Sequence, residues 1–157
     1  MGEMNIFSSG TAKDYYSAGC QFLEAARRCF SDKEGYIIKD GTLIQLTAPA
    51  VVNGAFACEL FIKAMLVWEN TSFDFIHYLD DLFLKLSDET QKGISKFCMP
   101  KGTEKYQEEF LNLLKKYRNA FVVDRYYCQN LGWNNMSPIA ILTIAENLSA
   151  ITGAYIT

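Results

Sequence analysis

The chain has 157 residues, half of them hydrophobic and 21% charged, with only three prolines and ten glycines. This composition predicts a single folded domain over residues 1–157 with one hydrophobic core, and it excludes a disordered or fibrous protein. The formal net charge of -3 excludes the overall positive field of a general duplex-DNA or anionic-membrane binder, so any contact with nucleic acid has to be local.

Cysteine usage and the N-terminal sequence predict a cytoplasmic protein. The five cysteines are odd in number and widely spaced, and none form a C-x-x-C pair, so we expect reduced thiols. The opening MGEMNIFSSG lacks the charged and apolar regions of a secretion signal. The most apolar stretch, residues 48–68, contains Asn53, Glu59 and Lys63, which favours a buried core helix over a membrane span. No membrane partner is therefore expected.

The first half of the chain predicts two helices joined by a small hairpin. Between residues 11 and 30 apolar residues recur every three or four positions, which is the period of an amphipathic helix. Two short β-prone runs in residues 36–44 flank Asp40-Gly41, a dipeptide that readily adopts the positive φ angles of a type I′ turn. Residues 48–68 are apolar almost all round and predict the most buried helix.

Four more helices are predicted in the second half. The third occupies residues 78–86, and the fourth is capped by Ser87 or Asp88 and stopped by Pro100.

The fifth predicted helix is capped by Thr103 and extends to Arg125. The last helix opens with Ser137 as N-cap and Pro138 at the first helical position. The predicted fold class is therefore all-α, an antiparallel helical bundle of about five or six helices with a small β-hairpin between the first two.

Several familiar kinds of site are excluded by the sequence. The chain has no phosphate-binding G-x-x-x-x-G-K-[ST] loop, no G-x-G-x-x-G and no Cys/His cluster at zinc spacing, so neither a metal nor a cofactor is predicted. The single histidine, His77, is expected to cap or pack at the start of the third helix, because catalytic histidines need a positioned partner. Asp80 and Asp81 are adjacent and point about 100° apart on a helix, which argues against a shared acid/base site.

A basic and aromatic strip is predicted near the end of the fifth helix. If that helix continues through residues 117–126, Arg118 and Arg125 share a face with Lys115, and Tyr126 lies on the neighbouring face. Guanidinium groups bind phosphate through paired hydrogen bonds, and a tyrosine ring stacks on an unpaired base, so the strip suits single-stranded RNA.

A plainer interpretation of the same segment is a solvated helix face whose arginines pair with Asp124 or Glu108. The following residues, 127–136, include Trp133 and three asparagines. They form either a ligand-binding loop or a turn in which Trp133 covers the core. Both alternatives stay open at the level of the sequence.

Three segments together resemble the HEPN family of helical proteins. Residues 56–65, FACELFIKAM, resemble the second-helix signature cELxLKAL of bacterial members. Residues 77–83, HYLDDLF, resemble HdLxxLF, and residues 117–126, YRNAFVVDRY, resemble RNxFxxxRY. The segments occur in the family's order and span roughly half the chain. The resemblance implies an antiparallel helical bundle, often dimeric, that in active members cleaves RNA without a metal.

The catalytic pattern of the family is only half present. That pattern is Arg, often followed by a polar residue, then four to six residues and His, and Arg118 with Asn119 matches its opening. Where the histidine is expected, the chain has Val123, Asp124 and Arg125. Arginine does not release a proton in a protein, so it stabilises charge but does not replace a general base.

The resemblance therefore implies an RNA-associated protein of a toxin or phage-defence type, with weak or degenerate metal-independent endoribonuclease activity. Arg118 and Asn119 would be its catalytic residues, and Arg125, Tyr126 and Lys115 would bind RNA. The expected partners are a second copy in a homodimer, single-stranded RNA, and a partner protein or antitoxin. The alternative is a non-catalytic helical module for protein interaction or dimerisation, whose arginines form structural ion pairs. Nucleotide binding ranks last, because no backbone motif for phosphate is present.

Overall fold

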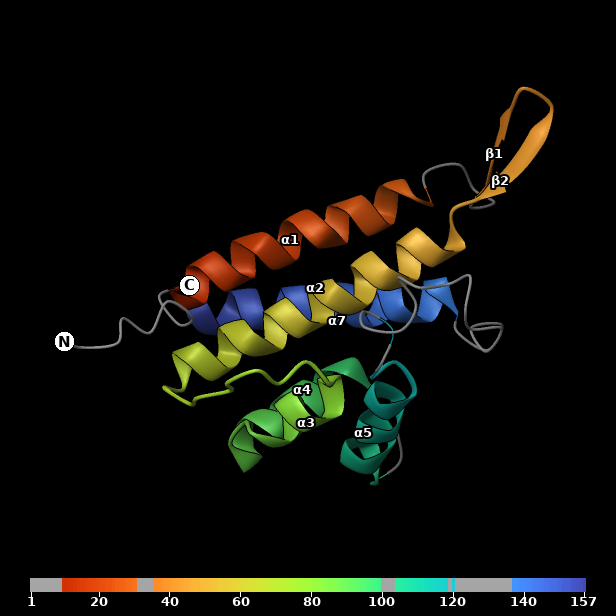
Figure 1. Ribbon diagram of the computed structural model, residues 1–157. Helices are drawn as coiled ribbons and strands as arrows, with labels where there is room; N and C mark the ends of the chain where they lie inside the picture. The colour runs from red at the N-terminus through yellow and green to blue at the C-terminus, as the bar shows by residue number, and fades with distance from the viewer. Residues whose placement is uncertain (1–9, 31–35, 100–103, 119, 121–136) are drawn as a thin grey trace.

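The computed structural model describes residues 10–30, 36–99, 104–118, 120 and 137–157. Within these residues it contains six helices and one two-stranded hairpin, which confirms the predicted all-α bundle. The helices form two groups that pack on each other (Figure 1).

The first group consists of the three longest helices, α1 (Ala12–Arg28), α2 (Thr47–Trp68) and α7 (Pro138–Ile156). Each of these helices contacts the other two. In Figure 1, α1 runs antiparallel to α2, and α7 runs in the same direction as α2. This layer provides most of the buried apolar surface, as the near-continuous hydrophobicity of α2 predicts.

The second group consists of three short helices, α3 (Leu79–Leu84), α4 (Asp88–Cys98) and α5 (Tyr106–Lys116). Helix α3 packs on α2 and α5, and α4 packs on α5 and α7. The start of α4 is capped by the Ser87 hydroxyl, which accepts a hydrogen bond from the Thr90 backbone N–H, so one of the two predicted caps is confirmed.

The predicted hairpin is confirmed between α1 and α2. Strands β1 (Tyr36–Lys39) and β2 (Thr42–Gln45) pair antiparallel, with Lys39 opposite Thr42. The two residues between them, Asp40 and Gly41, have φ angles of 51° and 75°, the left-handed conformation of a two-residue type I′ turn. The hairpin projects beyond the end of the helical layers (Figure 1).

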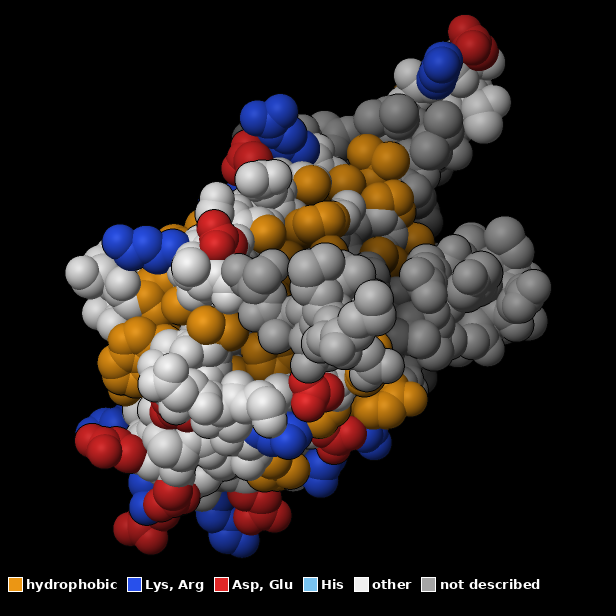
Figure 2. Space-filling view, turned by 60° about the vertical axis from the view of Figure 1, so that its left-hand side comes forward, with side chains coloured by type: hydrophobic (Ala, Val, Ile, Leu, Met, Phe, Trp, Pro, Cys, Tyr) orange, Lys and Arg blue, Asp and Glu red, His pale blue; other side chains and the backbone are white. Residues whose placement is uncertain are grey.

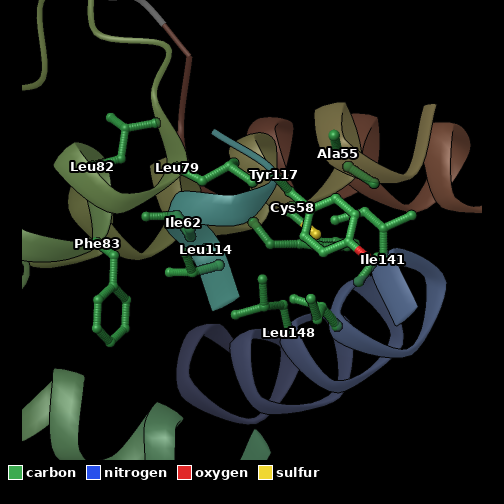
Figure 3. Close-up of a cluster of buried hydrophobic side chains, with 14 of the residues drawn as sticks. Ala55, Cys58, Ile62, Leu79, Leu82, Phe83, Leu114, Tyr117, Ile141 and Leu148 are labelled. Carbon is green, nitrogen blue, oxygen red and sulfur yellow. The ribbon is translucent and has the colours of Figure 1, made fainter. Parts of the chain in front are cut away.

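The core lies where the two groups meet (Figure 3). Cys58 and Ile62 of α2, Leu114 of α5, and Ile141 and Leu148 of α7 are all fully buried. The last helix begins at Pro138 with Ser137 as its N-cap, and it buries Ile141, Ile144, Ala145 and Leu148. The prediction that residues 48–68 form the most buried helix is confirmed by α2.

The prediction that the fifth helix reaches Arg125 is wrong. Helix α5 ends at Lys116, and Tyr117 is its C-cap. Beyond it, the N–H groups of Tyr117 and Arg118 bond to carbonyls three residues earlier, as in a tight turn. Tyr117 is buried, and its hydroxyl donates to the carbonyl of Ser137 and accepts from the Ser137 N–H, both at 3.2 Å. These contacts hold the side chain in the core at the point where α5 ends.

Among the helices that the structure describes, two are long and apolar enough to cross a membrane by length and composition alone, α2 and α7. The most apolar window of α2 is 78% buried inside the described structure, as expected of a core helix, whereas that of α7 is 33% buried. Helix α7 is therefore much less buried than α2 among the described residues.

Candidate functional site

A buried carboxylate on α2 organises the first part of the site. Glu59 lies in the centre of the helix with only 1% of its side chain exposed. Its Oε1 atom is 2.6 Å from Nζ of Lys63, the i,i+4 neighbour, and 2.9 Å from Nδ1 of His77. The other oxygen, Oε2, is buried and has no hydrogen-bond partner among the described residues. One carboxylate oxygen thus holds two side chains in place.

The structure gives His77 a positioned partner, which the sequence did not predict. Expected only to cap or pack, His77 instead lies just before α3, and its side chain is 50% exposed. An ionised carboxylate only accepts hydrogen bonds, so with Glu59 in that form Nδ1 of His77 is the N–H donor of this contact. Nε2 is then left as the acceptor on the half-exposed ring.

Arg118 forms the second part of the site, next to α3. Its Nε atom is 3.2 Å from Oδ1 of Asp80, and its Nη2 donates to Oδ2 of Asp81, also at 3.2 Å. The guanidinium carbon lies 4.5 Å from the centre of the Tyr78 ring, a cation–π contact. Two adjacent carboxylates therefore contact one arginine. Of the two partners that the plainer interpretation expected, Glu108 forms no ion pair with Arg118 among the described residues, and Asp124 lies outside them.

Burial differs sharply between the two aspartates. The Asp80 side chain is almost fully buried, and its Oδ1 and the Nε of Arg118 are both buried without a hydrogen bond, although they are in ionic contact. The Asp81 carboxylate and the Arg118 guanidinium are partly exposed. Asp80 thus contacts Arg118 in the interior, whereas Asp81 contacts it at the surface.

The two parts adjoin through residues 77–81. This short segment contains His77, which contacts Glu59, and Tyr78, Asp80 and Asp81, which contact Arg118, so the two sets of contacts are neighbours along the chain. We call the following six side chains the polar cluster: Glu59, Lys63, His77, Asp80, Asp81 and Arg118. They come from α2, from the start of α3 and from the turn after α5.

The sequence-predicted site residues are only partly brought together. Arg118 belongs to the polar cluster, whereas Lys115 is exposed in the last turn of α5. Because the helix ends at Lys116, the predicted common helical face of Lys115 and Arg118 does not form. Asn119, Arg125 and Tyr126 lie outside the described residues.

The sequence holds an indirect signal for the contact between His77 and Glu59. His77 is the single histidine of the chain, and Glu59 is the single carboxylate in the most apolar helix.

Within the described parts of the chain, no three His, Cys, Asp or Glu side chains are grouped to hold a metal ion. Comparison of the chain with family models, with curated proteins and with solved structures finds no match.

Proposed function

We propose that the protein is a HEPN-like, RNA-associated protein and that Arg118 contacts the phosphate backbone of single-stranded RNA. One observation carries the proposal: the polar cluster joins side chains from all three segments that resemble the family. Glu59 and Lys63 come from the first segment, His77 and the two aspartates from the second, and Arg118 from the third.

The chemistry of the cluster suits a phosphate beside an unpaired base. The Arg118 side chain is 37% exposed, and its ion pairs in the described structure use Nε and Nη2, so Nη1 is available to donate. Tyr78, whose ring contacts the guanidinium, is 41% exposed, and aromatic rings stack on the bases of single strands. Arg118 and Tyr78 would bind one nucleotide between them.

The surrounding charges predict weak, salt-sensitive binding. In Figure 2, Lys and Arg side chains are interspersed with Asp and Glu around the α3–α5 end of the visible face. Binding therefore rests on a few phosphate contacts, whose strength falls as salt rises. A protein that engages RNA in this way suits a toxin or phage-defence component, the cellular role that we propose for it.

The test is fluorescence anisotropy with a labelled, mixed-sequence single-stranded RNA at low salt. We expect Arg118→Ala to weaken binding about 10-fold or more, because a charge-assisted hydrogen bond contributes about 1.5 to 3 kcal/mol. Asp81→Asn should strengthen binding, because it removes a surface carboxylate that competes with phosphate. Arg28→Ala, in an exposed ion pair on α1, is the matched control. The proposal fails if Arg118→Ala and Asp81→Asn both bind as the wild type does.

The second candidate is a non-catalytic module for dimerisation or for binding a partner protein such as an antitoxin. It is favoured by the two carboxylates on Arg118, an arrangement that also describes a structural ion pair. It is favoured further by the largely unburied surface of α7. Under this candidate, Arg118→Ala lowers the melting temperature and leaves RNA affinity unchanged.

A further inference from the structure

We infer that the groove between α4 and α7 is a docking site for an amphipathic, acidic helix of a partner protein. The residues that line the groove are Gly93, Lys96 and Phe97 of α4 and Ile151 and Tyr155 of α7. None of them belongs to the polar cluster, so this inference goes beyond the proposed contact with RNA and uses a different part of the molecule.

The two walls of the groove are formed by residue pairs one helical turn apart. Gly93 and Phe97 lie four residues apart on α4, and Ile151 and Tyr155 lie four residues apart on α7, so each pair occupies one side of its helix. Phe97 is 47% exposed, although it is among the largest apolar side chains. A channel between two helices, with apolar walls, is the shape into which the apolar face of a third helix packs.

Trp68, the last residue of α2, extends this apolar surface beyond Tyr155. The two rings pack edge to face with 5.4 Å between their centres, and Trp68 remains 46% exposed. Aromatic side chains are enriched at the centres of protein interfaces, where they provide most of the binding free energy. Single exposed apolar residues are normal on any surface, whereas Trp68, Phe97 and Tyr155 gathered at one groove indicate a contact with another protein.

Lys96 determines which charge the partner should carry. It is exposed, and it is the single charged residue among those that line the groove. Lys92, one turn earlier, is paired with Asp88 at 2.6 Å, whereas Lys96 forms no ion pair among the described residues. The single charged residue of α7, Glu146, pairs with Arg27. A carboxylate beside the apolar stripe of the partner helix would therefore meet an ammonium group that has no other counter-ion, which favours an acidic partner over a basic one.

The experiment starts by selecting ligands for the full chain from a phage-displayed library of amphipathic helices. The selected helices should carry Asp or Glu beside an apolar stripe with i, i+4 spacing. A fluorescein-labelled synthetic peptide of the selected sequence then gives the dissociation constant by fluorescence anisotropy. Phe97→Ala should weaken the binding of this peptide about 10-fold or more, because truncation of an aromatic anchor removes a large part of the binding free energy.

A charge exchange tests the role of Lys96. Lys96→Glu should weaken binding of the acidic peptide about 10-fold or more, because it places like charges together. The same peptide with Lys in place of its acidic residue should bind Lys96→Glu more tightly than it binds the wild type, a result that a misfolded variant does not give.

Lys39→Glu is the matched control for this charge change. Lys39 is exposed on the hairpin, which lies at the other end of the bundle from the C-terminal end of α7 (Figure 1). This variant should bind the acidic peptide as the wild type does. Circular dichroism establishes that each variant is folded, and Phe97→Ala and Lys96→Glu both replace exposed side chains.

The outcomes separate the possible occupants of the groove. Weaker binding by Phe97→Ala together with the reversed charge preference of Lys96→Glu supports the docking site. A selection that yields no binder, or binders whose affinity is unchanged in both variants, overturns it. Light scattering identifies a second copy as the occupant: a dimeric wild type that Phe97→Ala converts to a monomer overturns the acidic partner. RNA anisotropy should be unchanged in Phe97→Ala, because Arg118 lies outside the groove.

Discussion

At the scale of single residues, burial determines how much stability is lost when one partner of an ion pair is removed. The Glu59–Lys63 and Asp88–Lys92 pairs have the same i,i+4 spacing and the same 2.6 Å separation. The first pair is almost completely buried, whereas more than half of each side chain in the second is exposed. Water screens the exposed charges, while an unpaired charge in the interior has no such compensation.

The same substitution at these two lysines should therefore change the free energy of unfolding by very different amounts. Lys63→Met should lower the free energy of unfolding by about 3 to 5 kcal/mol, because Glu59 would be left buried beside an uncharged neighbour. Lys92→Met should give a change within the error of urea denaturation. Equal, small effects of both substitutions would show that His77 alone compensates the Glu59 charge.

At the scale of elements, one glycine determines how closely α1 and α2 approach. A Cβ atom on Gly19 would lie 2.7 Å from Cε1 of Phe61, whose ring is fully buried. A Cβ on Gly93 of α4 would meet only the Tyr155 hydroxyl, at 2.9 Å, at the free end of a partly exposed side chain. The first contact is with a ring that has no room to move, and the second is with an atom that swings aside.

Alanine at these two helical glycines should therefore act in opposite directions. Gly19→Ala should destabilise the protein by about 1 to 3 kcal/mol, the usual effect of overpacking a core. Gly93→Ala should be neutral or stabilise by up to about 1 kcal/mol, because alanine favours the helix. Thermal melts of both variants decide the matter, and stabilisation by Gly19→Ala would contradict the close approach of α1 and α2.

Glu69 joins the end of α2 to the start of α4. Its carboxylate accepts hydrogen bonds from the hydroxyls of Ser87 and Thr90 and from the Ser87 backbone N–H. Partial burial raises the pKa of Glu69, but these three hydrogen bonds outweigh that effect and leave the pKa below its ordinary value of 4.5. The charged form is thus favoured by folding.

A depressed carboxylate pKa predicts a definite pH dependence. The contribution of Glu69 to stability is complete above pH 4.5 and is lost as the pH falls through the lower pKa of the folded state. Glu69→Gln should therefore lower the melting temperature at pH 7, and the gap to the wild type should narrow at about pH 3. A difference in melting temperature that is the same at both pH values would show that the charge of Glu69 does not contribute to stability.

Local signals in the sequence were enough to predict most elements, but not the contacts between them. The Ser137-Pro138 start of α7 and the Asp40-Gly41 turn depend on neighbouring residues, and both are confirmed. The end of α5 depends on Tyr117, whose hydroxyl partner is 20 residues further along the chain. For the same reason, the partners of His77 and Arg118 appear only once the helices pack, at separations of 18 and 37 residues.

At the scale of the whole molecule, the outward surface of α7 bears on the proposed homodimer. Ile139 is 68% exposed near the start of this helix, and the helix carries a single charged residue, Glu146. A helical surface with so few charges is a candidate for self-association through a two-fold axis.

Light scattering at micromolar concentration should therefore give twice the chain mass of 17.8 kDa. Ile139→Glu should shift the protein to the monomer, because a charge would be placed in the apolar interface. Leu84→Glu, at a comparably exposed leucine on α3, is the matched control and should leave the mass unchanged. A monomeric wild type would contradict dimerisation.

The buried counter-ion of Arg118 would set an upper limit on the affinity of the proposed RNA contact. A phosphate that drew the guanidinium outward would also draw it from Asp80, whose carboxylate would stay in the interior without its cation. Part of the free energy gained from the phosphate contact would then be lost as protein stability, and a bound strand would dissociate sooner. The proposed site would therefore favour brief encounters and rapid release along a long polymer over lasting storage of one strand.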